Sequence, residues 1–187
     1  MSYFDLGKAE ISPNTPVVAG SFATITYTYT AGHPMDYAGY IKITFRNMED
    51  FGQPQFDNPK APNYCTVKAT GGSRVIPRWD PKGGVRPSNK ALFLIIRDQY
   101  LDHGEQVQVV FGDTSGGSPG WRMPTFCISQ FRFTTFVDPI ANYLFKELPE
   151  SPTLSIVAGE PARAVCTVPS EVRAGQTFDY HLRLEDR

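Results

Sequence analysis

Short runs of alternating apolar and polar residues, separated by glycine and proline, constrain this chain more than any other feature. The 187 residues include 16 glycines and 16 prolines, which fall mostly between the patterned runs. In 22–29, with threonines between them, alternate positions carry Ala23, Ile25, Tyr27 and Tyr29. β-branched and aromatic residues at a period of two predict a half-buried strand.

The same alternation recurs along the chain and leaves little room for helices. We expect further strands at 40–46, 64–69, 107–111 and 126–137. Residues 91–96 are apolar on both faces, so we expect a central strand that is covered on each side. Many short strands with turns between them predict an all-β fold, an antiparallel β-sandwich of immunoglobulin-like or jelly-roll type.

Two similar segments divide the chain into a predicted sandwich domain, 1–150, and the first strands of a second β domain, 151–187. Both segments, 11–22 and 168–178, pass through a proline turn into Val-x-Ala-Gly and then into a strand. The second copy supplies about three strands, too few for a sandwich of its own. We therefore expect a truncated immunoglobulin-like domain, with the apolar positions of 178–184 facing its interior, in a natural protein that continues further.

Charge and hydropathy argue against several partners. Lys and Arg number 18 against 19 Asp and Glu, so the formal net charge of −1 gives no broad basic field for nucleic acid or an anionic membrane. The longest apolar stretch, 91–96, is too short to cross a bilayer. The first residues lack a secretory signal, and Cys65, Cys127 and Cys166 have neither disulfide-framework nor zinc-site spacing. We expect a cytoplasmic protein, or a chain from which a leader has been removed.

No catalytic constellation can be assembled from the sequence. Gly112–Gly117 is similar to the Gly-Asp-Ser-Gly-Gly loop of trypsin-like proteases, but Thr114 changes the spacing of the acid and the serine. The three histidines form no metal-binding pair, and Glu49, Asp50 and Asp57 are better explained as solvated loop charges than as calcium ligands. We expect neither a metal, nor a cofactor, nor an active site.

One segment, 68–90, carries a local excess of positive charge. Its only acid is Asp80, against six basic residues: Lys68, Arg74, Arg78, Lys82, Arg86 and Lys90. Prolines exclude a helix there, so we expect a loop, and a second expected loop holds the other tryptophan. If the loops meet, a platform for a sugar ring or an anionic group would consist of Trp79, Trp121, Arg78, Arg86 and Arg122. The alternative is that each tryptophan covers a core edge or packs on a neighbouring domain.

Several ordered motifs resemble the amino-terminal region of an uncharacterised bacterial family, catalogued only as a domain of unknown function. They cover most of the chain and comprise Asp36–Ile43, Asp50–Pro59, Asn63–Val67, Gly112–Gly120 and the later Pro169-Ser170 with Gly175. Position 38 is alanine where the pattern favours glycine. Members of this family are much longer, and their downstream part resembles metal-dependent phosphoesterases of the polymerase-and-histidinol-phosphatase (PHP) type.

The resemblance implies that the chain is the amino-terminal fragment of a metal-dependent hydrolase, without the metal-binding half. We therefore expect a non-catalytic accessory β-sandwich that packs on downstream domains of the same parent chain. The alternative is a carbohydrate- or anion-binding module that uses the tryptophans and arginines named above.

Overall fold

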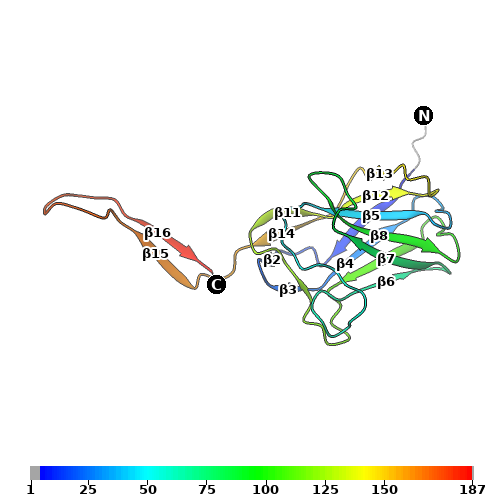
Figure 1. The fold of residues 1–187 in the computed structure, drawn as a ribbon, viewed down its shortest axis with the longest axis horizontal. Helices are drawn as coiled ribbons and strands as arrows, with labels where there is room; N and C mark the ends of the chain where they lie inside the picture. The colour runs from blue at the N-terminus through cyan, green and yellow to red at the C-terminus, as the bar shows by residue number, and fades with distance from the viewer. Residues whose placement is uncertain (1–4, 187) are drawn as a thin grey trace.

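The computed structural model describes residues 5–186, and all regular elements in that range are strands (Figure 1). In chain order they are β1 (Lys8–Ser12), β2 (Val17–Val18), β3 (Phe22–Ala23), β4 (Ile25–Thr30), β5 (Tyr40–Phe45), β6 (Cys65–Ala69), β7 (Arg74–Asp80), β8 (Lys90–Arg97), β9 (Gln106–Phe111), β10 (Trp121–Arg122), β11 (Ile128–Arg132), β12 (Thr134–Asp138), β13 (Lys146–Glu147), β14 (Thr153–Val157), β15 (Arg163–Thr167) and β16 (His181–Glu185). The predicted all-β fold is confirmed. Within the same residues, no helix has the length and hydrophobicity of a membrane span.

Two antiparallel sheets enclose one core. One sheet has four strands in the order β1-β4-β9-β6, and the other has five in the order β13-β12-β5-β8-β7. Two smaller sheets, β11-β14-β2 and β10-β3, extend the sandwich. The core is a single cluster whose largest fully buried side chains include Trp121, Tyr27, Tyr29, Phe45 and Phe111. Two sheets packed around such a cluster are typical of a β-sandwich.

Alternation along the strands sends successive side chains to opposite faces. On β4, Ile25 and Tyr27 are fully buried. On β5, Ile41 and Ile43 are fully buried, whereas Lys42 between them is partly exposed. The predicted central strand is confirmed, because β8 lies between β5 and β7 in the five-stranded sheet.

Part of the positively charged segment 68–90 is a strand, which corrects the expected loop. Arg74–Asp80 forms β7, an edge strand in antiparallel register with β8. Pro77 lies opposite Leu94 in this pairing. Proline lacks the N–H that a helix or a central strand needs, but an edge strand leaves one side of its backbone unpaired and tolerates it.

The last strand of the sandwich lies inside the segment that the sequence assigned to a second domain. β14 pairs with β11 and β2, and Leu154 and Ile156 are buried in the common core. Residues 153–157 therefore belong to the sandwich. Beyond them, β15 and β16 pair in a hairpin, here called the arm (158–186), which projects from the sandwich (Figure 1). A second domain built around the arm stays a prediction.

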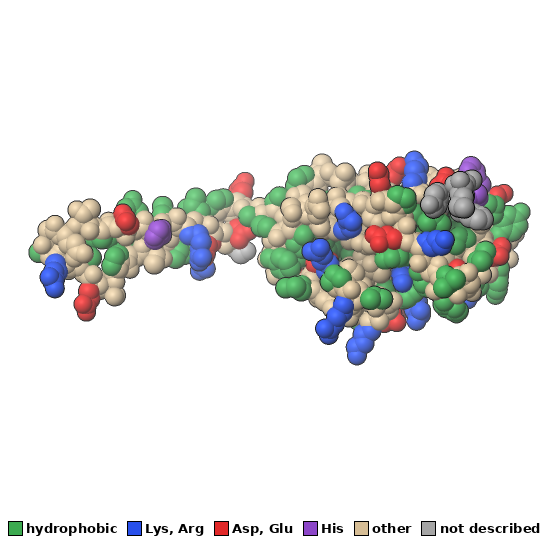
Figure 2. Space-filling model, turned by 90° about the horizontal axis from the view of Figure 1, so that it is seen from above, with side chains coloured by type: hydrophobic (Ala, Val, Ile, Leu, Met, Phe, Trp, Pro, Cys, Tyr) green, Lys and Arg blue, Asp and Glu red, His purple; other side chains and the backbone are tan. Residues whose placement is uncertain are grey.

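The arm exposes the side chains that were expected to face an interior. Phe178, Tyr180, Leu182 and Leu184 are between 43 and 65% exposed, and apolar side chains lie uncovered along the arm in Figure 2. The reason is geometric: a two-stranded hairpin buries apolar side chains only when another layer packs on it.

Candidate functional site

Trp121, which the sequence placed either on a ligand platform or over the edge of the core, is a core residue. Its side chain is fully buried, and its ring stacks on Phe111 with the centroids 4.7 Å apart. Its Nε1 donates a 2.6 Å hydrogen bond to the Gly52 carbonyl. The expectation of a sugar-stacking surface at Trp121 is therefore corrected, since the ring is not accessible to a ligand.

Trp79 and Arg78 point to opposite faces of β7, because successive strand residues alternate. Trp79 lies opposite the buried Leu92, and its ring packs against Phe51 with the centroids 6.0 Å apart. Its Nε1 is buried without a hydrogen-bond partner among the described residues. The guanidinium carbon of Arg78 lies 4.5 Å from the centre of the Phe93 ring on the other face. The structure thus separates two residues that were expected to act together.

Arg122 joins two loops. Its guanidinium donates to the Asp50 carbonyl, and its backbone N–H donates a 2.9 Å hydrogen bond to Oδ1 of Asn63. The Asn63 N–H in turn donates to the Gly120 carbonyl at 2.8 Å. Three motifs that carry the family resemblance, around residues 50, 63 and 120, therefore meet at one structural junction.

The five-stranded sheet has an outer face, formed by the side chains that point away from the core. Its members on β5 and just beyond are Tyr40, Lys42, Thr44 and Arg46; those on the neighbouring strands include Phe136, Phe93, Ile95, Arg97, Arg74, Ile76 and Arg78. The strand register places four of them in one row across the sheet, in the order Phe136, Lys42, Phe93 and Arg78. Aromatic and basic side chains thus alternate across four strands.

Three arginines line a groove at one end of the outer face, here called the arginine groove. They are Arg46 after β5, Arg86 in the β7–β8 loop and Arg132 at the end of β11, around a volume of about 580 Å³. Among the described residues, none of the three guanidinium groups forms an ion pair. Arg86 is the one predicted site residue that lines this groove.

The β7–β8 loop is held against the end of β5, which positions Arg86. The Asn47 N–H donates a 3.0 Å hydrogen bond to the Pro87 carbonyl, and the Asn89 N–H donates to Oδ1 of Asn47 at 3.1 Å. Neutral polar side chains complete much of the groove wall: Ser88, Ser129, Gln130 and Thr134. The groove is therefore polar, and its arginines come from three separate segments.

Two carboxylates border the arginine groove. Glu49 is only 4% exposed and accepts a 3.0 Å hydrogen bond from the Arg46 N–H. Burial raises the pKa of the Glu49 carboxyl, which that hydrogen bond and the nearby charges of Arg46 and Lys90 partly oppose. Glu147, on β13, also lines the groove and is exposed. The three guanidinium groups outnumber these two carboxylates.

Lys42 is surrounded by aromatic rings. Its Nζ lies 4.0 Å from the centre of the Phe145 ring, 5.0 Å from that of Phe136 and 5.8 Å from that of Phe93. Burial lowers the pKa of Lys42. An aromatic ring attracts a cation without neutralising it, so the positive charge of Lys42 remains available to an anion.

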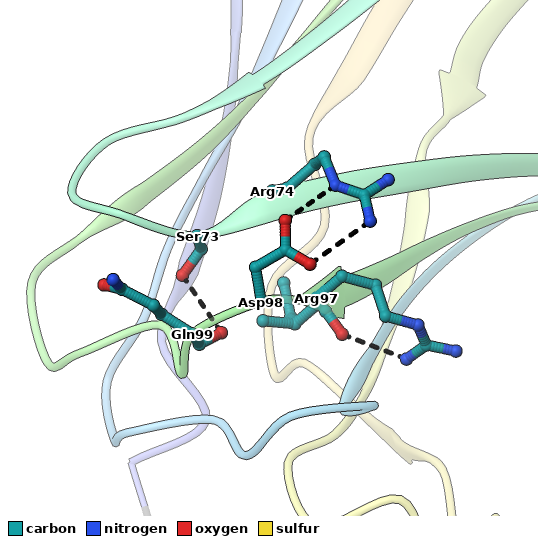
Figure 3. Close-up of polar contacts among 6 residues, drawn as sticks. Ser73, Arg74, Arg97, Asp98 and Gln99 are labelled. Carbon is teal, nitrogen blue, oxygen red and sulfur yellow. Dashed lines mark hydrogen bonds and ion pairs between the residues drawn. The ribbon is translucent and has the colours of Figure 1, made fainter.

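Arg97, at the far end of the outer face, turns away from the neighbouring ion pair. Figure 3 shows Asp98 bound to Arg74 through hydrogen bonds of 2.8 and 3.2 Å, and these bonds lower the pKa of Asp98. The Arg97 guanidinium instead donates to the Ile96 carbonyl at 3.0 Å. It also lies 5.1 Å from the centre of the Tyr37 ring. Like Lys42 and Arg78, Arg97 is thus a cation placed beside an aromatic ring.

The other candidate sites have structural explanations. Asp113 accepts hydrogen bonds from the Thr66 hydroxyl at 2.7 Å and the Ser115 N–H at 2.9 Å, so its carboxylate fixes the Gly112–Gly117 loop. Within residues 5–186, no three His, Cys, Asp or Glu side chains gather as a metal site would require.

The sequence matches no model of a protein family and no curated protein. The function must therefore be inferred from the charges and geometry of the outer face.

From the sequence, four cations of this face were not assigned to a site: Lys42, Arg46, Arg97 and Arg132. For Lys42 a signal was present, because a basic residue between Ile41 and Ile43 in an alternating strand must point away from the core. The grouping of Arg46 with Arg132 depends on pairing between distant strands, for which the chain carries no local signal.

Proposed function

We propose that the chain is a non-catalytic β-sandwich module that binds an anionic ligand in the arginine groove. The observation that carries the proposal is the position of Arg46, Arg86 and Arg132 around one groove, without an ion-pair partner among the described residues. A guanidinium group presents its N–H donors in a plane that matches a carboxylate, sulfate or phosphate. Like charges repel one another, so an anion between these arginines would be favoured.

The wall of the groove also suits a carbohydrate that carries the anionic group. Ser88, Ser129, Gln130 and Thr134 offer hydroxyl and amide groups, which can hydrogen-bond to sugar hydroxyls as well as to anions. The proposed ligand is therefore a carbohydrate or small molecule with an anionic group. In this proposal arginines alone take the binding role that the sequence assigned jointly to tryptophans and arginines.

A thermal-shift experiment with glucose, glucuronate and sulfate tests this proposal. A ligand at ten times its Kd stabilises the folded state by about 1.4 kcal/mol, or roughly 3 to 6 °C for a chain of this size. We expect shifts from sulfate and glucuronate but not from glucose, and a smaller shift in Arg132→Gln. The control is Arg163→Gln, because Arg163 lies on the arm in an ion pair with Glu185. No shift at all, or equal loss in both variants, would refute binding in the groove.

A second candidate function, an accessory role against other domains of the same parent chain, is favoured by the arm. Leu182 and Leu184 are 60% and 62% exposed, and exposed apolar surface of this kind often marks an interaction site. In this reading, a downstream PHP-like hydrolase supplies the catalysis, as the family resemblance implies. Sedimentation should show concentration-dependent association that the double variant Leu182→Ser/Leu184→Ser weakens without lowering the Tm. A wild-type chain that stays monomeric at high concentration would count against this role.

The proposal also places the protein in the cytoplasm. Cys65, Cys127 and Cys166 are free thiols, and the last two are exposed. Exposed thiols stay unpaired most readily in a reducing compartment. Fractionation of cells that make the natural protein tests this placement, and recovery from an oxidising compartment would contradict it.

A further inference from the structure

The cations of the outer face recur at regular intervals along the strands. Arg46 follows Lys42 by four positions along β5 and into its end, and Arg97 follows Phe93 by four positions on β8. Lys42 and Phe93 are paired in register on antiparallel strands, so Arg46 and Arg97 lie on opposite sides of this pair along the strand direction. The cations therefore occupy three successive positions along the strands, here called levels: the arginine groove, then Lys42 with Arg78, then Arg97. Four strand residues span roughly 13 Å. A single small anion therefore reaches one level only, whereas an extended polyanion along the strands reaches all three.

Most of these cations keep their charge available. Lys42 and Arg97 form no ion pair among the described residues, and Arg78 lies 3.8 Å from Asp80 in a loose, partly exposed pair. Aromatic rings lie against Lys42, Arg78 and Arg97, and the Ile96 carbonyl also accepts a hydrogen bond from Arg97. The levels thus stay positive even though the whole chain carries a formal net charge of −1.

The central ring of the row, Phe93, is covered, which bears on the chemical class of the polyanion. Phe93 is 7% exposed, with Arg78 over its ring and Lys42 beside it. Single-stranded nucleic acid is usually bound by stacking its bases on open aromatic rings. A polysaccharide with carboxylate or sulfate groups can be bound through its charges and hydroxyls, which the groove and the three cationic levels can contact.

We propose that this face binds a linear acidic polysaccharide, laid along the strands from the arginine groove past Lys42 to Arg97. The proposal rests on the anion-binding function proposed above and extends it from one groove to the whole outer face. The anionic groups of the polymer contact successive cationic levels, and the hydroxyl and amide groups of the groove bind sugar hydroxyls at one end.

Calorimetric titration of the full chain with heparin oligosaccharides of increasing length tests this arrangement. Sulfate is the single-anion reference, and single-stranded DNA of similar length is the competing polyanion. We expect affinity to rise with oligosaccharide length and to fall steeply with salt. Lys42→Gln and Arg97→Gln should each lower the affinity for the long oligosaccharide by about two- to fivefold and leave sulfate binding unchanged. Arg163→Gln on the arm is the control, and circular dichroism confirms that each variant is folded.

The possible outcomes separate the two proposals. If the longest oligosaccharide binds no more tightly than sulfate, or if Lys42→Gln and Arg97→Gln bind it like the wild type, the polymer arrangement is wrong and the groove proposal stands. If DNA binds as tightly as the oligosaccharide, the assignment to a polysaccharide is wrong. If neither sulfate nor any oligosaccharide binds, the anion-binding function itself fails.

Discussion

Replacing Ala38 with glycine should stabilise the protein, because Ala38 occupies a backbone conformation that glycine adopts at little cost. Ala38 has a φ of 73° and is the third residue of a turn in which the Gly39 N–H donates a 2.8 Å hydrogen bond to the Asp36 carbonyl. A positive φ at the third position of a turn favours glycine. Glycine is also the residue that the family resemblance leads us to expect at this position, so the expected departure and the strained conformation coincide.

The expected gain follows from two opposing effects. Relief of the left-handed conformation contributes about 1–2 kcal/mol, and the greater freedom of glycine in the unfolded chain removes about 0.4–1 kcal/mol. The net stabilisation is about 0.5–1 kcal/mol, which raises the Tm by about 1–4 °C. Urea unfolding and thermal melting measure it directly.

Ala69→Gly is the matched control, because Ala69 ends β6 without a positive φ. Glycine in that strand should lower the free energy of unfolding by about 0.5–1 kcal/mol. Each substitution removes one alanine methyl group, but the two should change the free energy of unfolding in opposite directions. A loss of stability in Ala38→Gly equal to that in Ala69→Gly would refute the reasoning.

Three other predictions concern the core and the outer face. Trp121→Phe should lower the free energy of unfolding by about 1–3 kcal/mol more than Trp79→Phe. The reason is that only the Trp121 indole N–H makes a hydrogen bond, and its loss leaves a buried carbonyl without a donor. Equal urea unfolding curves would contradict this. Two thiols per native chain should react with a thiol reagent at neutral pH, and Cys65 only after unfolding, since burial raises the pKa of its thiol to about 12; three fast-reacting thiols would exclude a buried Cys65. Burial also lowers the pKa of Lys42, so the unfolded chain binds the Lys42 proton more tightly than the folded chain does. The free energy of unfolding should therefore rise as the pH rises toward about 10.4, the ordinary lysine pKa, and it should rise more in the wild type than in Lys42→Gln. Identical pH profiles would show that Lys42 is not desolvated.

Much of the fold could be predicted from the sequence because the alternation is local. The pattern in 22–29 and 40–46 identified which side chains enter the core, and the apolar run 91–96 identified a central strand. The prediction was wrong at 74–80, where prolines excluded a helix and a loop was expected in place of a strand. An edge strand tolerates proline, and the order of strands in a sheet is set by long-range pairing.

The candidate site was less predictable, for the same physical reason. Arg86 was named from the local charge excess, but its partners come from distant segments that meet only in the folded sheet. The sequence left open whether Trp79 and Trp121 form a ligand platform or cover the edge of the core, and in the structure both rings pack against the core. For Trp79, alternation along Arg74–Asp80 would have separated it from Arg78 once the segment was recognised as a strand.

The most direct test of the anion-binding face is an NMR titration of the arginine Nε–H signals with sulfate. The signals of Arg46, Arg86 and Arg132 should shift together along one binding curve. The Arg74 and Arg163 guanidinium groups are already in ion pairs with carboxylates, so their signals should move little. If the ion-paired arginines shift as much as those of the groove, or if the groove signals stay still, the arginine groove is not an anion-binding site.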